Sequence, residues 1–184
     1  MRATPDPEAA WRRWRDVRDE LFRTHPQSAL PRERRAGFNG LDYFAYDPAL
    51  RVLADVEEAP EESRQIAGSA GAAILFRRFG RVRFELLGER QALELYWLEG
   101  YGGGVFLPFG DATTGKETYD GGRYVLDTVK GADLGGDAGG RLVLDFNFAY
   151  NPSCSYDPRW ACPLTPPANR LPFPICAGEI HHDV

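Results

Sequence analysis

The chain has 184 residues, a formal net charge of −5 and ordinary shares of apolar and charged residues. This composition predicts a folded chain that needs no disulfides, and it argues against a nucleic-acid partner because phosphate contacts need clustered cations. The N-terminus has no apolar signal segment, and no apolar run approaches the roughly 20 residues that span a bilayer.

We therefore expect a cytoplasmic protein with no membrane partner, no cofactor and reduced cysteines. The length fits a single domain over residues 1–184.

An α-helix is expected over residues 7–24. Asp6 is a capping residue, Pro7 suits the first helical position, and Glu8 lies near the positive end of the helix dipole. His25 precedes a proline, which disfavours the α conformation and ends the helix. The apolar stripe consists of Ala10, Trp14, Val17 and Leu21, flanked by Trp11, Arg18 and Phe22. This stripe predicts that the helix docks on the rest of the domain; the alternative is a helix that binds a partner protein.

A β module is expected over residues 38–179, where the apolar pattern changes to a period of two. Short strands are expected at 41–46 and 51–57, and the acidic stretch Asp55 to Glu62, which contains Pro60, is expected to be a solvated loop. Alternating residues predict further strands at 81–86, 93–97, 105–109, 123–129 and 142–148. Gly88-Glu89 is the predicted hairpin turn between the first two of these, and the glycine-rich stretch 131–140 is a predicted loop.

Successive strands with short turns favour an antiparallel sheet. The fold class expected is therefore mostly β, an antiparallel barrel or two-sheet sandwich of about nine or ten strands with an N-terminal α-helix.

Three stretches resemble catalytic or nucleotide-binding motifs but lack a required part. Gly110 to Glu117 nearly matches a phosphate-binding loop, yet Glu117 stands where a Ser or Thr should hold magnesium, and a turn follows instead of a helix. Residues 67–71 resemble a nucleophile elbow, and residues 100–104 resemble a dinucleotide-binding loop. Both motifs require a helix directly after the turn, but each stretch leads into a predicted strand. We expect none of these functions.

Residues 147–171 form a proline-rich stretch without a helical or strand period. It follows a strand on which Asp145 and Asn147 share one face, opposite the apolar residues. If that face lines a cavity, these polar groups suit a ligand pocket; if it faces solvent, they carry no function.

The cysteines of this region allow four interpretations. Cys154 and Cys162 could form a disulfide, act as a nucleophile with a histidine base, or be buried structural thiols. The fourth is a zinc site, although the tight paired spacing typical of such sites is missing. Its ligands would be Cys154, Cys162, Cys176 and His181 or His182.

Four stretches together resemble the family known as domain of unknown function 1684. They are HPQSAL (25–30), FNGLDYFAYDPALRV (38–52), LPFGDATTGKETYDGGRYV (107–125) and DFNFAYNPSCSYDPRWACPLTPPANRLPFPICAGE (145–179). The resemblance implies one module without an established activity, so it supplies no catalytic residue.

The family pattern has cysteines at positions 154 and 162, but it does not reliably have them at 176, nor histidines at 181 and 182. It therefore implies a centre formed by the thiol pair Cys154 and Cys162 together with Tyr150, Asn151, Asn169 and Glu179. Some relatives look exported, and there a disulfide would be favoured.

The first functional hypothesis is a small-molecule-binding β module with a polar pocket near residues 111–124 and 145–156. The expected ligand-binding residues are Arg123, Asp145, Asn147, Tyr150, Asn151 and Asn169. The alternatives are a thiol-dependent enzyme that uses Cys154 or Cys162, and a structural or interaction protein.

Overall fold

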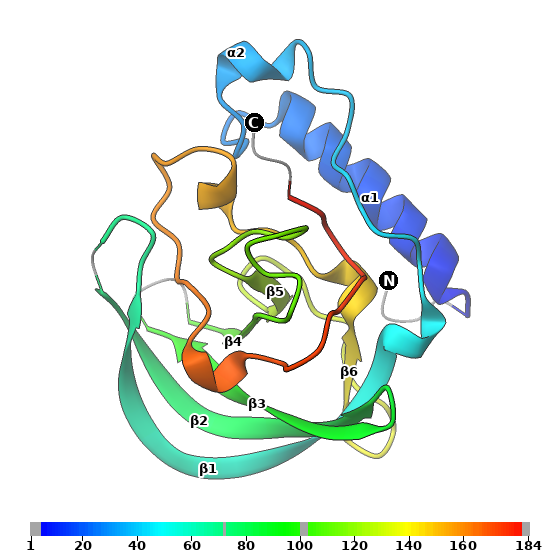
Figure 1. The fold of residues 1–184 in the computed structure, drawn as a ribbon, viewed down its shortest axis with the longest axis vertical. Helices are drawn as coiled ribbons and strands as arrows, with labels where there is room; N and C mark the ends of the chain where they lie inside the picture. The colour runs from blue at the N-terminus through cyan, green and yellow to red at the C-terminus, as the bar shows by residue number, and fades with distance from the viewer. Residues whose placement is uncertain (1–4, 72, 100–102, 182–184) are drawn as a thin grey trace.

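The structure is a computed structural model that describes residues 5–71, 73–99 and 103–181. Its central element is an antiparallel sheet with the strand order β5-β4-β3-β2-β1-β6 (Figure 1). The strands are β1 (Arg51–Ala67), β2 (Ala73–Leu86), β3 (Glu89–Leu98), β4 (Val105–Phe109), β5 (Arg123–Asp127) and β6 (Leu142–Asp145). The helices are α1 (Pro7–Thr24), α2 (Arg32–Arg35) and the short 3-10 turns η1 (Pro48–Leu50), η2 (Phe146–Phe148), η3 (Ser153–Ser155) and η4 (Pro167–Asn169).

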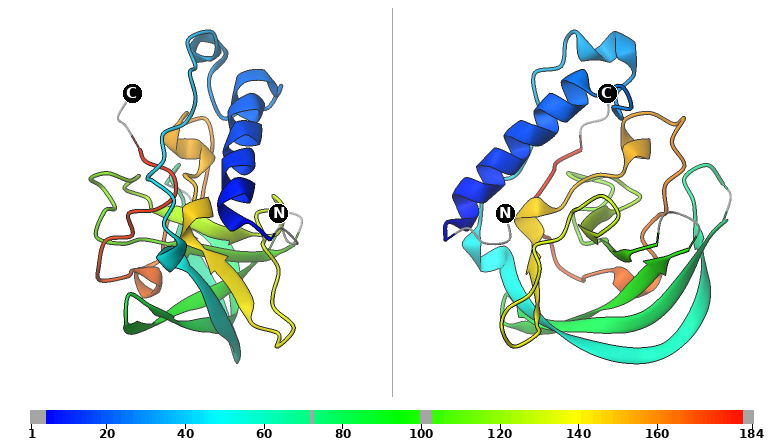
Figure 2. Two further views of the ribbon diagram at one scale, coloured as in Figure 1. Left: turned by 90° about the vertical axis from the view of Figure 1, so that its right-hand side faces the viewer. Right: turned by 180° about the vertical axis from the view of Figure 1, so that it is seen from behind.

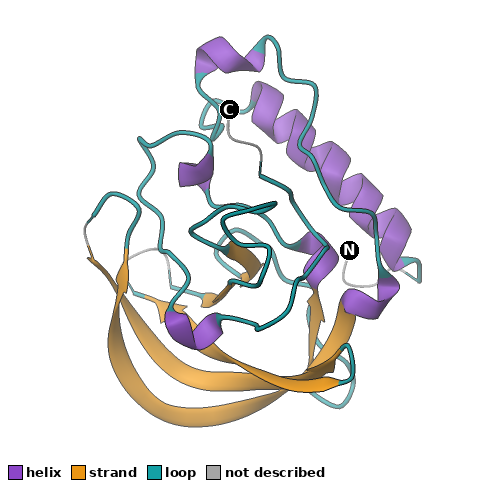
Figure 3. Ribbon diagram, viewed as in Figure 1, coloured by secondary structure: helices purple, strands orange, loops and turns teal. Residues whose placement is uncertain are grey.

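The sheet curves into a nearly closed, barrel-like shape. β1, β2 and β3 bend strongly, and loop segments occupy their concave side (Figure 3). The chain beyond β6 then returns to β5, because Tyr124 and Tyr150 exchange backbone hydrogen bonds of 3.0 and 3.1 Å. The mostly β, antiparallel class is confirmed, with the barrel-like alternative favoured over two separate sheets.

The number of strands is smaller than predicted. The described residues form six strands rather than nine or ten. Residues 41–46 contribute only an isolated bridge between Tyr43 and Glu179, so the strand expected there is absent. The predicted strand at 142–148 ends at Asp145, where the side chain caps η2 by accepting from the Asn147 N–H.

The acidic stretch predicted to be a loop belongs to β1 instead. Its carboxylates are paired with arginines of β2: Glu57 lies 2.6 Å from Arg83, and Glu62 lies 3.0 Å from Arg78. A bulge between Glu58 and Glu62 accommodates Pro60, which has no N–H to donate. β6 covers only residues 51–54 of β1 in the described structure. Charges and a proline along the remaining edge protect it against pairing with another chain.

The β2–β3 hairpin turns one residue earlier than predicted. Leu86 pairs with Glu89, which leaves Leu87 and Gly88 as the turn residues. Both have positive φ, 53° and 80°, as a type I′ turn requires. Leu87 is 57 % exposed, so its strained backbone carries a side chain that contributes little to the core.

The core follows the predicted alternation in β2 but not throughout β3 and β4; in β4, Phe106 is buried together with the expected Leu107 and Phe109. Val82, Phe84 and Leu86 of β2 point inward as expected. A register shift between Arg78 and Gly80 changes the inward face of β3. As a result, Tyr96 and Leu98 are buried in place of Trp97. The barrel core contains Leu93, Leu95, Leu107, Phe109, Leu126, Leu144, Phe146 and Ile175.

Helix α1 has the predicted bounds and lies across one side of the barrel (Figure 2). Asp6 caps it by accepting from the Ala9 N–H at 3.0 Å, and His25 is already extended. Trp11 is 4 % exposed and donates from Nε1 to the Asn147 carbonyl at 2.8 Å, while Trp14 lies 5.2 Å from the Phe148 ring. The predicted docking of α1 is therefore confirmed.

The inward face of α1 is rotated relative to the predicted stripe. Val17 and Leu21 are 54 % and 48 % exposed, whereas Arg18 and Phe22 face the domain. Arg18 and Phe22, which were expected only at the margin of the stripe, pack against the aromatic side chains Tyr150 and Tyr156 beneath α1.

Candidate functional site

The two cysteines at positions 154 and 162 meet at one end of the barrel. The η3 turn places Cys154 so that its backbone N–H donates to Cys162 Sγ at 3.3 Å. Cys162 lies on a segment that extends the sheet beyond β1, because its carbonyl accepts from the Ser69 N–H at 2.9 Å. The Tyr119 hydroxyl lies 3.5 Å from Cys154 Sγ. Both cysteines are free thiols, so the structure holds a dithiol at this point.

The two thiols differ strongly in acidity. A hydrogen bond from the Cys162 thiol lowers the pKa of Cys154 to about 6, against the opposing effect of burial, and the hydroxyls of Ser69 and Tyr119 contribute. The same hydrogen bond raises the pKa of Cys162, and burial and the charge of Cys154 raise it further. At neutral pH the pair therefore carries one negative charge, centred on Cys154.

A cavity of about 330 Å³ adjoins this dithiol, with Cys162 in its wall. We call it the aromatic cavity, because its body is lined by apolar and aromatic side chains from β2, β3, β4 and β5. The residues of this part are Ile74, Phe76, Leu98, Phe106 and Tyr124. Its polar lining consists of Gln27, Asp127, Lys130, Ser153 and Trp160, of which Gln27 and Lys130 are exposed and Asp127 is buried.

A second cavity, of about 650 Å³, lies between the C-terminal half of α1 and the barrel. We call it the helix cavity; Arg18, Leu21 and Phe22 of α1 form its helix side, and Tyr156, which follows η3, packs against Phe22. Tyr150 and Asn151 line its barrel side. Gln27, Lys130 and Ser153 line both cavities, so the two are neighbours at one mouth of the barrel.

Two buried polar atoms at these cavities have no hydrogen-bond partner among the described residues. They are Oδ1 of Asn151, in the helix cavity, and Nε1 of Trp160, in the aromatic cavity. Asn151 is 3 % exposed and is held by its Nδ2, which donates to the Ile180 carbonyl at 3.2 Å. A buried polar group without a partner costs about 1–3 kcal/mol. The protein thus leaves one acceptor and one donor unsatisfied, and both belong to residues in the cavity walls.

The predicted ligand-binding residues divide into two groups. Tyr150 and Asn151 line the helix cavity. Arg123, Asp145, Asn147 and Asn169 are not among the residues that line either cavity. A ligand contact by these four residues stays a prediction.

The four residues outside the cavities are buried and bonded within the protein. Arg123 donates to Asp111 Oδ2 at 2.9 Å and to the Ile175 carbonyl at 3.0 Å. Asn169 bridges β3 and β4, accepting from the Glu94 N–H at 2.8 Å and donating to the Pro108 carbonyl at 2.8 Å. These bonds fix the loops on the concave side of the sheet.

Asp145 and Asn147, which were predicted to share one face of a strand, are likewise bonded within the protein. Asp145 accepts from Arg51 at 3.1 Å and from Asn147 Nδ2 at 2.8 Å. Asn147 in turn accepts from the Asp47 N–H at 2.9 Å. These contacts join the segment before β1 to the segment after β6.

The buried ion pair at the helix cavity was not predicted from the sequence. Arg18 donates to Glu179 at 2.8 Å and lies 5.0 Å from the centre of the Tyr150 ring. Glu179 was expected near the site, but its partner was not. The sequence feature that could have predicted this ion pair is the position of Arg18 at the margin of an otherwise aromatic helix face. Trp160, Gln27 and Lys130 carried no recognisable motif.

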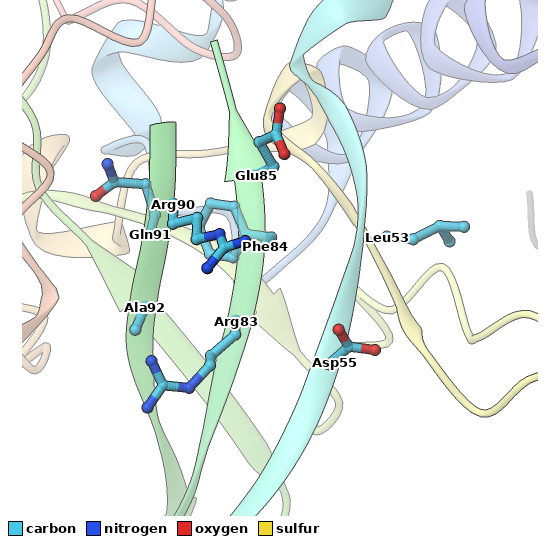
Figure 4. Close-up of a pocket in the computed structure, with 8 residues that line it drawn as sticks. All are labelled: Leu53, Asp55, Arg83, Phe84, Glu85, Arg90, Gln91 and Ala92. Carbon is cyan, nitrogen blue, oxygen red and sulfur yellow. The ribbon is translucent and has the colours of Figure 1, made fainter. Parts of the chain in front are cut away.

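A third cavity, of about 470 Å³, is a groove on the outer face of the sheet (Figure 4). Its lining residues are Leu53, Asp55, Arg83, Phe84, Glu85, Arg90, Gln91 and Ala92. Asp55 and Arg83 are paired across β1 and β2, and the charged side chains of this groove are exposed to solvent. Since solvent satisfies their polar groups, this groove is a weaker candidate than the barrel mouth.

The described residues contain no group of three or more His, Cys, Asp or Glu side chains that could hold a metal ion. The zinc set considered from the sequence is thus not assembled there, and His182 lies outside the described residues. No described helix is long and apolar enough to cross a membrane. The residues directly after Lys116 form turns that lead into β5 and not a helix, which agrees with the rejection of a phosphate-binding loop.

Fold and site together define a mostly β, barrel-like protein with a docked N-terminal helix and a dithiol beside two adjoining cavities. The chain belongs to the family described as "Protein of unknown function (DUF1684)", whose profile matches residues 36–180. This confirms the resemblance found in the sequence.

One solved structure is similar over nearly the full length. It is the solution NMR structure of an uncharacterized protein from gene locus rrnAC0354 of Haloarcula marismortui, with 36 % identity and a TM-score of 0.67. The match covers 94 % of this chain and 93 % of that one. None of the curated proteins matches the sequence.

Proposed function

We propose that this protein binds a small molecule at the mouth of the barrel, in the aromatic and helix cavities. The observation that carries the proposal is the unpaired, buried Oδ1 of Asn151 in the wall of a cavity. The lining supports it, because ligand sites combine an apolar body with a few convergent polar groups. The proposed pocket lies around residues 124–130 and 150–163, which overlaps the expected regions 111–124 and 145–156 at Tyr124 and within residues 150–156.

The chemistry of the walls defines the class of ligand. Phe76, Phe106 and Tyr124 favour a flat, largely apolar or aromatic body. Asn151 Oδ1 calls for a hydrogen-bond donor on the ligand, and Trp160 Nε1 calls for an acceptor. Lys130 is exposed at the rim shared by both cavities and favours a ligand whose acceptor end is anionic. The ligand class proposed is therefore a small amphipathic molecule with one donor and an anionic acceptor group.

Anilinonaphthalene sulfonate has these features and is the probe for the test. Its fluorescence is titrated with the wild-type protein and with Ala161→Trp. Ala161 is exposed and lines the aromatic cavity, so tryptophan there blocks the mouth without entering the core. Ala45→Trp, at another exposed alanine, is the matched control. We expect saturable one-to-one binding by wild type and Ala45→Trp and at least tenfold weaker binding by Ala161→Trp, whereas equal binding by all three would refute the proposal.

Three further expectations belong to the same proposal. The net charge of −5 supports the absence of a nucleic-acid partner. The free cysteines are consistent with a cytoplasmic, reducing compartment. The extensive contacts of α1 with the barrel support a binding module over an interaction protein that presents this helix to a partner.

A further inference from the structure

The dithiol at the barrel mouth is a chemical feature that ligand binding does not require. Cys154 and Cys162 are separated by a loop that folds back on itself, so that the Cys154 N–H reaches Cys162 Sγ. The thiols differ in exposure: Cys162 is 6 % exposed, whereas Cys154 is half-buried. Cys154 is therefore the more accessible thiol of the pair from solvent, and Cys162 is the more buried one.

We propose that Cys154 and Cys162 form a redox couple in which Cys154 is oxidised by a hydroperoxide and Cys162 resolves the product to a disulfide. This activity is independent of the ligand proposed above. It uses the contact between the two thiols and the hydroxyl groups around Cys154.

The groups around Cys154 stabilise its thiolate. The Tyr119 hydroxyl lies 3.5 Å from the sulfur, and the Cys154 N–H holds the Cys162 sulfur close by, at 3.3 Å from the Cys154 nitrogen. The Ser69 hydroxyl holds the cysteine loop in place, because it donates to the Trp160 carbonyl at 3.2 Å and accepts from the Cys162 N–H at 3.0 Å. A thiolate that accepts several hydrogen bonds is favoured over the thiol, and the thiolate is the nucleophile. Cys162 remains a protonated thiol until it attacks the oxidised Cys154 in the second step.

The proposed reaction takes place in two balanced steps. The Cys154 thiolate attacks the nearer oxygen of the hydroperoxide, the O–O bond breaks, and a sulfenic acid forms while the alkoxide or hydroxide leaves and takes a proton from solvent. Cys162 then attacks the Cys154 sulfur, forming the S–S bond. The hydroxide that leaves combines with the Cys162 proton as water. Two electrons pass from the dithiol to the peroxide, and an external thiol restores the reduced pair.

Cys176 provides an internal reference, because it is exposed and lies outside the pair. Wild type, Cys154→Ser, Cys162→Ser and Cys176→Ser are treated with hydrogen peroxide, and intact and peptide masses are followed over time. Thermal melting of each variant verifies that it is folded.

In wild type and Cys176→Ser we expect a loss of about 2 Da that maps to Cys154 and Cys162 and is reversed by dithiothreitol. In Cys162→Ser we expect a sulfenic acid at Cys154 that dimedone traps, and in Cys154→Ser we expect at least tenfold slower oxidation of Cys162. If wild type gives no linked pair, or if Cys154 oxidises no faster than Cys176, the proposal is wrong.

Discussion

Arg18 in α1 and Glu179 near the C-terminus form an ion pair of 2.8 Å between elements that are 161 positions apart in the sequence. Glu179 is 1 % exposed and also accepts from the Asn151 N–H at 3.0 Å and from the Tyr156 hydroxyl. The pair thus connects the helix to the segment that carries Asn151 and to the segment that carries the thiols. It fixes the position of α1 and thereby the shape of the helix cavity.

Replacing Arg18 should strongly destabilise the fold. In Arg18→Met the Glu179 carboxylate remains buried without its counter-charge, which typically costs about 3–5 kcal/mol. Arg12→Met is the control, because Arg12 forms an exposed pair with Glu8 that is worth well under about 1 kcal/mol. Urea unfolding measures both values. Similar losses for the two variants would show that the buried pair does not hold α1.

The defect of Arg18→Met should depend on pH. Burial raises the pKa of Glu179, and Arg18 opposes this shift in wild type. Without Arg18 the native pKa lies higher still, so the folded state retains a proton that the unfolded state has already lost. Stability is therefore preserved below the unfolded pKa of about 4.3 and declines as the pH rises through the native pKa. Unfolding measured from acid to neutral pH should show a growing difference from wild type; a constant difference would contradict this assignment.

Cys154 should be reactive at acidic pH. With a pKa of about 6 it is roughly 24 % thiolate at about pH 5.5, against about 0.1 % for an ordinary cysteine of pKa about 8.5. Its weaker intrinsic nucleophilicity removes about a factor of ten, which leaves an advantage of about ten- to twentyfold. Iodoacetamide labelling against pH, read by mass, measures this.

A variant at Tyr119 tests the cause of this reactivity. Tyr119→Phe removes one hydroxyl near Cys154 and should raise the pKa of that thiol, which shifts the labelling profile to higher pH. Tyr46→Phe serves as the control, because Tyr46 packs against Trp11 of α1 and not against the cysteines. If Tyr119→Phe leaves the profile unchanged, the hydroxyl does not stabilise the thiolate.

Removal of the Asn151 amide should weaken the proposed ligand site. Asn151→Ala deletes the unpaired acceptor, and binding of anilinonaphthalene sulfonate should fall about tenfold, as expected for one lost buried hydrogen bond. Asn39→Ala, at an exposed asparagine, should bind like wild type. Equal affinities for Asn151→Ala and Asn39→Ala would remove Asn151 from the site.

The features predicted correctly from the sequence are those set by neighbouring residues. Asp6, Pro7 and the His25-Pro26 step define the ends of α1 through capping and backbone sterics alone. The alternation in β2 likewise identifies Val82, Phe84 and Leu86 as core residues. These interactions involve residues that are close in sequence, so they can be predicted from the local sequence alone.

The features that were missed depend on residues distant in sequence. Glu57 and Glu62 belong to a strand because arginines of β2 lie opposite them, which local composition does not reveal. The protein partners of Arg123 and Asn169 are distant as well. Arg123 bonds to Asp111 and to the Ile175 carbonyl, and Asn169 bonds to backbone groups of β3 and β4. Both cavities likewise lie where separate segments meet. The helix cavity is lined by residues 18–29, 129–130 and 150–156, and the aromatic cavity by β2, β3, β4 and β5 together with residues 153–163. No local sequence motif marks such a place.

The central claim is that the barrel mouth, rather than the outer groove, takes a small molecule. Backbone amide NMR spectra of the protein, recorded while anilinonaphthalene sulfonate is added, test it most directly. We predict saturable shift changes at Gln27, Lys130, Ser153 and Ala161, which line the aromatic cavity. Shift changes confined to Asp55, Arg83, Glu85 and Arg90 in the outer groove, or no changes at all, would contradict the account.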